Sequence, residues 1–431
     1  MTMRIEGCEI HKPYSIEEEE EEEEQEGEEE EEDGSIEMKL YKKKVLLEFR
    51  SKLEDAILGN LLFSPSQNGS GSESTLEGNS LGISLWGVPL LPSEGHHGTD
   101  TVLMKFLIAK DFKVSEAFEM LRKTLIWRKE FKIDGVLEEK LVSHLQDAHI
   151  SNLCGTDRDG RPLLYSFFGA FKDKELYKKT FGTEDKREEF VRWRIQMVEK
   201  AIQQLSFKPG GVDSIISIAD MKDSPCSKSM KELRGVCNQV ICVLQDFYPE
   251  IVWRYVYVNV PLWFYTYHTV FCKIIDPRNR KKIIFSRATK VTKTLTKSIA
   301  PEQIPVQYGG LRMENDDEFS PENEVLEMIV KAGAIESIRI PIEEPGVTVV
   351  WDVTVVGWDV TYREEFIPDD DCSYNILIQK DKKMEASVRN SFYISEPGMI
   401  LLTIDNASFK KKKVFYRFKT KPTLPVYILL Q

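Results

Sequence analysis

The sequence predicts a multidomain protein in which a small helical bundle precedes an α/β domain and an all-β sandwich follows it. Three observations support this prediction. A chain of 431 residues is long enough for two to three domains of roughly 150 residues each. Up to about residue 310, apolar strand segments alternate with amphipathic helical segments. After Arg312, apolar and polar residues alternate with the period of antiparallel strands.

An acidic run dominates the first 80 residues, which are predicted to form a disordered leader. Residues 17–33 hold 15 acidic side chains and no basic one, and without them the formal charge of −13 becomes nearly neutral. Such a segment buries too little apolar surface to fold. The run is either a solvated spacer or a mimic of anionic lipid that competes for basic patches elsewhere in the chain.

Within this leader, one amphipathic helix is expected over residues 38–58, and a Ser/Gly-rich linker follows at 64–80. The helix is indicated by apolar side chains at helical spacing, namely Leu46, Phe49, Leu53 and Ile57. Residues 81–150 then carry further amphipathic helical patterns and are predicted to form the helical bundle.

Residues 151–312 are predicted to form the α/β domain. Its expected strands are "RPLLYSFFGAF", "SIISIAD", "RYVYVNVP" and "KKIIFS". Between them, apolar stripes within residues 187–205 and 230–247 predict helices. This order of strands and helices favours a mostly parallel sheet with helices packed on it. The glycine pair in "PVQYGGL" marks the end of the pattern.

Residues 313–431 are predicted to form an antiparallel β-sandwich. The expected strands lie in "GVTVVWDVTVVGWDVTYREEF", "SYNILIQK", "SFYISEPGMILLTIDN" and "KVFYRF". Gly, Pro and Asp residues separate these segments, as expected for the turns of an antiparallel sheet.

The search for catalytic motifs gives no reason to expect an enzyme. The sequence has no GxSxG, HExxH, Gly-rich phosphate loop or GxGxxG, and its six histidines are scattered. Seven cysteines without a CxxC pair favour a reducing compartment over a disulfide framework or a zinc site. No signal peptide or membrane span is recognised. We therefore expect a cytoplasmic protein without catalytic residues, metal or cofactor, whose contact with membranes is peripheral.

The segment from Leu262 to Ile275 is apolar around the whole helix that it predicts. It is too short to span a bilayer, which needs about 20 apolar residues, so it belongs in a core or against something oily. Extracting a two-chain lipid exposes on the order of 30 methylenes at ~0.8 kcal/mol each, so a carrier needs an oily interior. We interpret the segment as a movable gate over an acyl pocket, with an ordinary core helix as the alternative. The gate and pocket residues are Leu262, Trp263, Phe264, Tyr267, Phe271 and Ile274.

Two basic patches indicate docking to an anionic membrane surface. The stretch 278–297 carries eight basic side chains and no acid. The second patch begins with Lys410–Lys413, continues with Arg417, Lys419 and Lys421 on alternating strand positions, and is interleaved with aromatic residues. Each cation near an anionic leaflet contributes about 1 kcal/mol, which makes docking reversible. A solvated basic face is the alternative for any single residue, and nucleic-acid binding is disfavoured because the C-terminal domain is otherwise rich in Asp and Glu. The predicted docking residues are Arg278, Arg280, Lys281, Lys410, Lys411, Lys412 and Lys413.

Several of these motifs, in this order, resemble a known family. "LMKFLIAKDFKVSEAFEMLRKTLIWRKEF", "DRDGRP", "DFYPEIVWRYVYVNVP" and "IPVQYGG" are similar to the CRAL-TRIO lipid-binding module, whose best-known member is the yeast phosphatidylinositol/phosphatidylcholine transfer protein. "VVGWDVTYREEFIP", "YNILIQK" and "LTIDNASFKKKKVFYRFKTKP" are similar to the GOLD domain of plant patellins. The glutamate-rich leader and "WGVPLL" also fit patellins.

The resemblance implies a function and a set of headgroup residues. It implies a phosphoinositide-binding or transfer protein in membrane trafficking and cell division, with phospholipid as ligand, no nucleic acid, and trafficking proteins as partners of the GOLD domain. The alternative is an adaptor that is recruited by lipid and does not transfer it. Ile215 stands where the family offers a second hydroxyl, which weakens the expectation of choline-lipid binding. The implied headgroup residues are Glu250, Lys282, Lys110, Asn279 and Ser217.

Overall fold

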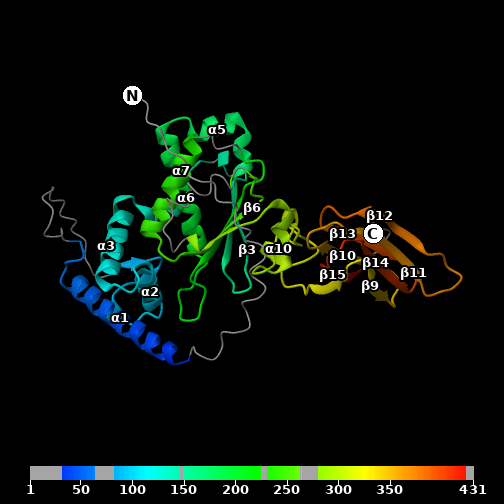
Figure 1. The fold of residues 1–431 in the computed structure, drawn as a ribbon, viewed down its shortest axis with the longest axis horizontal. Helices are drawn as coiled ribbons and strands as arrows, with labels where there is room; N and C mark the ends of the chain where they lie inside the picture. Colours follow the sequence, from blue (N-terminus) through cyan, green and yellow to red (C-terminus); the bar gives the residue numbers. More distant parts are fainter. Residues whose placement is uncertain are drawn as a thin grey trace, which may run out of the picture.

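The structure is a computed structural model that describes residues 32–63, 82–142, 144–145, 149–224, 231–262, 264 and 280–423. Figure 1 shows a helical and α/β part, coloured blue to green, joined side by side to an elongated β-sandwich in orange and red. Among the helices described, none is long and apolar enough to cross a membrane.

The N-terminal helices pack together as a bundle. Its main helices are α1 (Glu32–Leu58), α2 (Thr99–Ala109) and α3 (Val114–Glu130). Short elements accompany them: β1 (Ser84–Leu85), β2 (Val88–Pro89), η1 (Pro92–Glu94) and η2 (Ile133–Glu138). Helix α1 begins six residues before the predicted start. It buries Phe49, Leu53 and Ile57 in the same core as α2 and α3, although the sequence pattern placed it in the leader.

The α/β part is built on a five-stranded sheet of order β3-β4-β5-β6-β7. Strands β4 to β7 are parallel, as predicted, and β3 pairs antiparallel with β4. The strands are β3 (Ser151–Thr156), β4 (Pro162–Phe167), β5 (Ile215–Asp220), β6 (Val252–Val258) and β7 (Ile283–Phe285). The "DRDGRP" segment forms the β3–β4 turn, in which the Asp157 carboxylate accepts hydrogen bonds from the backbone N–H of Asp159 and Arg161.

Helices cover both faces of this sheet. The longer helices lie on one face: α5 (Lys174–Phe181), α6 (Glu184–Ile202) and α7 (Lys231–Phe247). The 3-10 helix η3 (Phe168–Lys172) packs with α5 and α6, because Phe171 contacts Phe181 and Phe190. Shorter elements cover the other face: η4 (Ala288–Lys290), α10 (Val291–Leu295), η5 (Pro301–Gln303) and η6 (Val306–Tyr308). Figure 1 shows α6 and α7 on the side of β6 away from α10. Because strand residues alternate, Leu164 faces α6 and α7 while Leu163 packs with Leu295 on the opposite face.

The C-terminal part is a sandwich of two four-stranded antiparallel sheets, as predicted. One sheet has the order β13-β10-β15-β8, and the other has the order β12-β11-β14-β9. The first contains β8 (Leu326–Val330), β10 (Val347–Val355), β13 (Val388–Ile394) and β15 (Lys412–Pro422). The second contains β9 (Ala334–Ile342), β11 (Thr361–Pro368), β12 (Ile376–Lys383) and β14 (Gly398–Asn406). Inward-facing side chains such as Trp351 and Phe366 are fully buried between the sheets.

The glycine pair predicted as a boundary forms a packed junction between the two parts. Gly309 has a φ of 80°, and its backbone oxygen accepts a hydrogen bond from Thr354 Oγ1 at 2.9 Å. A Cβ atom on Gly310 would lie 2.0 Å from the backbone oxygen of Ile304, so only glycine fits there. The Gly310 oxygen also accepts a hydrogen bond from Ser387 Oγ at 2.6 Å. The sandwich is therefore held to the α/β part by direct contacts.

Candidate functional site

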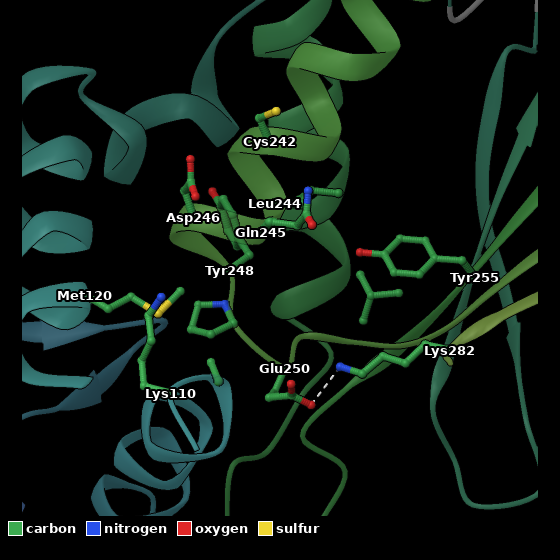
Figure 2. Close-up of a pocket in the computed structure, with 13 residues that line it drawn as sticks. Lys110, Met120, Cys242, Leu244, Gln245, Asp246, Tyr248, Glu250, Tyr255 and Lys282 are labelled. Atoms are coloured by element: carbon green, nitrogen blue, oxygen red, sulfur yellow. Dashed lines mark hydrogen bonds and ion pairs between the residues drawn. The ribbon is translucent and has the colours of Figure 1, made fainter. Parts of the chain in front are cut away.

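A polar pocket of about 360 Å³ opens where the helical bundle, the end of α7 and the sheet meet. Its volume falls within the ~300–1,000 Å³ range typical of small-ligand sites. Figure 2 shows side chains from the helical bundle, from α7 and from the sheet converging on it. It is lined by Ala109, Lys110, Met120, Cys242, Leu244, Gln245, Asp246, Tyr248, Pro249, Glu250, Val252, Tyr255 and Lys282.

An ion pair between Glu250 and Lys282 forms one wall of this pocket. Lys282 Nζ lies 2.7 Å from Glu250 Oε2, and both side chains keep less than a fifth of their surface exposed. Glu250 follows α7 with a φ of 56°, an uncommon left-handed backbone that turns the chain into β6. Lys282 precedes β7 by one residue, so it does not lie on the strand as predicted, but its carbonyl accepts a hydrogen bond from Tyr255 N–H.

A buried lysine from the helical bundle fixes the position of Glu250. Lys105, on α2, donates to the backbone oxygen of Glu250 at 3.0 Å and pairs with Asp213 at 3.1 Å. Burial lowers the pKa of the Lys105 ammonium, and the carboxylate of Asp213 opposes this change. Lys105 of the helical bundle therefore holds the backbone of Glu250, which lies 145 residues later in the sequence, at the wall of the pocket.

Of the five predicted headgroup residues, three line this single pocket. Lys110, Glu250 and Lys282 all face it, with Lys110 at the end of α2 on the side opposite Lys282 (Figure 2). Ser217 lies on β5, beside Leu164 of β4 and Tyr255 of β6, and does not line the pocket. Asn279 lies outside the described residues. The headgroup roles of these residues remain predictions.

Several side chains on the face of the sheet that α6 and α7 cover are not fully buried. Tyr255 points from β6 toward the pocket (Figure 2), and burial raises the pKa of its phenol. Its side chain nevertheless keeps intermediate exposure, as do Ser217, Tyr257, Ile283 and Phe285 on the same face of the sheet. We interpret this combination as a hollow between α7 and the sheet, and we call it the hollow below. The acyl-pocket role of this region remains a prediction.

The predicted gate is described at only two positions. Leu262 is 76% exposed, whereas Phe264 is 6% exposed and its ring lies 6.0 Å from that of Tyr257 and 5.6 Å from that of Phe285. Phe264 therefore covers the hollow at the β6–β7 end. The remaining gate residues, Trp263, Tyr267, Phe271 and Ile274, lie outside the described residues.

The predicted docking residues divide between the two parts of the molecule. Arg280 and Lys281 are exposed beside the start of β7, while Arg278 lies outside the described residues. In the sandwich, Lys410 and Lys411 are exposed, Lys412 is half-buried, and Lys413 pairs with Glu327 at 2.7 Å. Their contact with membrane remains a prediction.

The basic pattern along β15 was only partly interpreted correctly. Arg417 is 2% exposed and pairs with Asp352 at 2.8 Å, so it belongs to the protein interior and cannot belong to a basic surface. Lys419 and Lys421 both pair with Glu318, which partly neutralises that end of the strand. The exposed basic patch is therefore confined to the β14–β15 connection.

Sequence reasoning missed Lys105 and Arg194, which both carry a buried charge. Each sits among apolar positions of a helix: Lys105 between Met104 and Phe106, and Arg194 three residues after Val191 on the apolar stripe of α6. A charged residue on the buried face of a helix is the signal that could have found them. Within the described part of the chain, no group of three or more His, Cys, Asp or Glu residues could hold a metal ion.

Comparison with known proteins identifies both folded parts. A family model described as "CRAL/TRIO domain" matches residues 147–310, and one described as "Patellin-1-like, C-terminal GOLD domain" matches residues 331–412. The chain is 48% identical to Patellin-4 of Arabidopsis thaliana over 342 residues, covering 79% of this chain and 62% of that protein. It is 41% identical to Patellin-6 of Arabidopsis thaliana, covering 78% of this chain and 82% of that protein.

More distant matches cover the α/β part. The chain is 27% identical over 221 residues to "Phosphatidylinositol transfer protein SFH5" of Scheffersomyces stipitis, covering 48% of this chain and 66% of that protein. The crystal structure of Sfh5 matches 62% of this chain and 94% of its own at 20% identity, with a TM-score of 0.48. The chain spans about three fifths of the length of Patellin-4.

Proposed function

Because this chain belongs to the patellin family and combines a CRAL-TRIO domain with a GOLD domain, we propose that it binds a phosphoinositide and acts peripherally at membranes in membrane trafficking. The headgroup would lie in the Glu250–Lys282 pocket, and the acyl chains would enter the hollow between α7 and the sheet. The single observation that carries this proposal is the Glu250–Lys282 ion pair on the wall of a polar pocket beside that hollow. The relative named a phosphatidylinositol transfer protein adds support.

The chemistry of the pocket suits a phosphorylated inositol ring. The Lys282 ammonium has three donors, so it can keep its bond to Glu250 and still donate to a phosphate oxygen. The Glu250 carboxylate has two oxygens and can accept hydrogen bonds from ring hydroxyls. Lys110 adds a second positive charge on the opposite side of the pocket. Two cations and one carboxylate therefore match a ligand that combines phosphate with hydroxyls.

The headgroup assignment predicts a large effect of one substitution. Lys282→Ala is expected to weaken binding of a short-chain, soluble phosphoinositide by about 10–100-fold, because a charge-assisted hydrogen bond contributes ~1.5–3 kcal/mol. Isothermal titration calorimetry with the dibutanoyl lipid measures this effect without membrane docking. Lys281→Ala, the exposed neighbour, is the matched control and should bind normally. Equal affinities of Lys282→Ala and the unchanged protein would contradict the assignment.

A rigid loop in the GOLD domain is suited to membrane docking. The buried Asn406 side chain donates to the carbonyl oxygens of Lys331 and Lys410, each at 2.9 Å, and accepts from Ser408 Oγ at 2.6 Å. These bonds fix a loop at whose tip the Phe409 ring is fully exposed. An aromatic ring flanked by lysines fits the interface of an anionic bilayer, where the ring inserts and the lysines contact headgroups.

This docking role makes a second prediction. Phe409→Ala is expected to weaken binding to vesicles of phosphatidylcholine with 30% phosphatidylserine by about 5–10-fold, since the ring buries roughly half of its ~1.5–3 kcal/mol of apolar surface energy at the interface. Tyr374→Ala is the matched control, because Tyr374 is 90% exposed in the same domain but has no lysine cluster beside it. Vesicle co-sedimentation gives the affinities. If both variants bind vesicles equally well, Phe409 does not contact the membrane.

A second candidate function is an adaptor that binds a trafficking protein and does not move lipid. It is favoured by the edge strand β12, which leaves Ile376 and Leu377 exposed beside Tyr374. An exposed apolar edge strand can pair with an extended segment of another protein. The two functions are separated by mass spectrometry of lipid bound to the purified protein and by transfer of that lipid between vesicles. A carrier contains about one lipid per chain and moves it, whereas an adaptor does neither.

A further inference from the structure

The three buried cations among the described residues are each paired with a carboxylate, whereas one half-buried arginine is not. Arg128 pairs with Glu199, Arg417 with Asp352, and Lys105 with Asp213. This arginine is Arg194 of α6, whose polar contacts are with two hydroxyl groups and whose charge has no carboxylate partner in the described structure. Burying an ion without a counter-charge costs several kcal/mol, so this arrangement calls for an explanation.

The surroundings of Arg194 are polar but neutral. Its Nη1 donates to Ser166 Oγ at 2.9 Å and to Ser151 Oγ at 3.4 Å, both on the sheet below. The groups that carry any compensating charge are the Cys237 thiol on α7 and the Tyr257 phenol on β6. Burial raises the pKa of Cys237 to about 11, so this thiol is neutral at pH 7. The guanidinium stays protonated in proteins and therefore remains a single uncompensated positive charge.

The Arg194 side chain is not tightly packed on all sides. Burial lowers the pKa of the guanidinium, yet the side chain keeps intermediate exposure. Cys237 and Tyr257 also keep intermediate exposure, although burial raises the pKa of the Cys237 thiol. Nη1 uses its two N–H groups on the serines, which leaves Nε and Nη2 as donors for which no described residue supplies an acceptor. The remaining donors and the positive charge are thus available to a molecule in the hollow.

We propose that Arg194 is the anion-binding group of an inner site that takes the acidic end of an amphiphile, a carboxylate or a phosphate, whose chain lies in the hollow. The fork of Nε and Nη2 matches two oxygens of such a group, and the apolar walls between α7 and the sheet match the chain. This inner site is distinct from the Glu250–Lys282 pocket and extends the proposed function to a second class of ligand.

The register of the sheet separates the two sites. Ser166, beneath Arg194, is in the same row as Ala219, Tyr257 and Phe285 across four strands. Tyr255, which lines the headgroup pocket, is two residues earlier on β6, so its row lies about 7 Å away along the strands. Ser166 and Phe285 are also three strands apart, or about 14 Å. One acidic group cannot reach both cations, so Lys282 and Arg194 would bind acidic groups at two separate positions.

The test compares acidic and neutral amphiphiles that have the same chain. The delipidated full chain is titrated with the fluorescent fatty acid cis-parinaric acid and with its neutral methyl ester. We expect the acid to bind at least about tenfold more tightly, the effect of one charge-assisted contact. Arg194→Met should remove this difference, Arg194→Lys should keep part of it, and Lys282→Ala should keep all of it. Competition by lysophosphatidate, with monoacylglycerol as the neutral control, shows whether phosphate serves as well as carboxylate.

Thermal stability distinguishes a ligand site from a structural role. An uncompensated buried cation destabilises the empty protein, so delipidated Arg194→Met should melt at the same temperature as the unchanged chain or higher. Equal binding of acid and ester by the unchanged chain, or an undiminished preference in Arg194→Met, would overturn the proposal. So would a lower melting temperature or misfolding of that variant.

Loss of phosphoinositide binding in Lys282→Ala with the acid preference retained would leave both sites standing. Retained phosphoinositide binding in Lys282→Ala, with the acid preference also retained, would remove the headgroup site alone, whereas loss of the acid preference in Lys282→Ala would overturn the inner site.

Discussion

Replacing Glu199 with alanine is expected to lower the free energy of unfolding of the CRAL-TRIO domain by about 3–5 kcal/mol, the usual cost of leaving a buried ion without its partner. Glu199 Oε1 lies 2.6 Å from Arg128 Nη1 and accepts a hydrogen bond from Tyr248 OH at 2.6 Å. Arg128 is 5% exposed and Glu199 3% exposed. Without Glu199, the guanidinium keeps only Asp134, whose side chain is 79% exposed and whose attraction water weakens.

The same substitution should also weaken lipid retention. The three groups join α3, α6 and the segment after α7, and Tyr248 lies two residues before Glu250. Loosening Tyr248 therefore loosens the backbone that presents Glu250 to the headgroup pocket. Hydrogen exchange of the α6 amides under native conditions measures the stability of this domain separately from the GOLD domain. Glu188→Ala, an exposed carboxylate on the same helix, is the control and should change exchange little. An α6 exchange rate in Glu199→Ala equal to that of the control would contradict the prediction.

The fold could be predicted in large part because burial imposes periodicity on the sequence. The parallel strands β4, β5 and β6 are short apolar runs, and α6 carries an apolar stripe that includes Val191, Ile195 and Val198. Strand β3 was missed because its residues, Ser151–Thr156, are all half-buried and mostly small or polar. Strands β8 and β9 were missed as well, although β9 alternates exposed and buried residues along much of its length.

The candidate site was harder to predict from the sequence, because its residues are far apart in the chain. The family resemblance supplied Glu250, Lys282 and Lys110, and the structure brings these three to one pocket. Which side chain holds Glu250 in place could not be predicted, because Lys105 lies 145 residues away. Helical periodicity places Arg194 on a buried face, but the absence of a carboxylate near it depends on how α6, α7 and the sheet pack.

Arg417 illustrates the same limit in the GOLD domain. Its spacing with Lys419 and Lys421 suggested a basic surface, but strand order decides what each residue faces. In the sheet, Asp352 of β10 stands directly between Arg389 of β13 and Arg417 of β15. Cross-strand neighbours of opposite charge interact closely, and here the pairing is buried. Without the order β13-β10-β15, the sequence does not reveal that these three residues form one group.

This group gives the second large prediction: Asp352→Ala should destabilise the GOLD domain by about 3–5 kcal/mol, since it leaves two guanidinium groups without their shared carboxylate. Asp352 is 1% exposed and accepts from Arg389 Nε at 2.6 Å and Arg417 Nε at 2.8 Å. Asp316, which pairs with Arg389 at 2.6 Å, would remain as the only carboxylate of the group that the structure describes. Asp381→Ala, an exposed carboxylate on β12, is the control. Differential scanning calorimetry should show an earlier transition for the GOLD domain alone.

The location of the group extends its effect to the junction between the domains. Arg417 Nη2 also donates to the carbonyl oxygen of Leu311 at 2.8 Å, and the Phe319 ring lies 4.4 Å from the Arg417 guanidinium. If Asp352 no longer orients Arg417, the segment from Leu311 to Phe319 loses its buried attachment to β15 and keeps the exposed pairs of Glu318 with Lys419 and Lys421. The loop at Phe409 and the Glu250–Lys282 pocket would then be coupled less tightly, because this segment links the two domains. Asp352→Ala should therefore raise amide exchange at residues 311–320 as well as in β15. Faster exchange in β15 with unchanged exchange at 311–320 would show that the glycine pair holds the junction without Arg417.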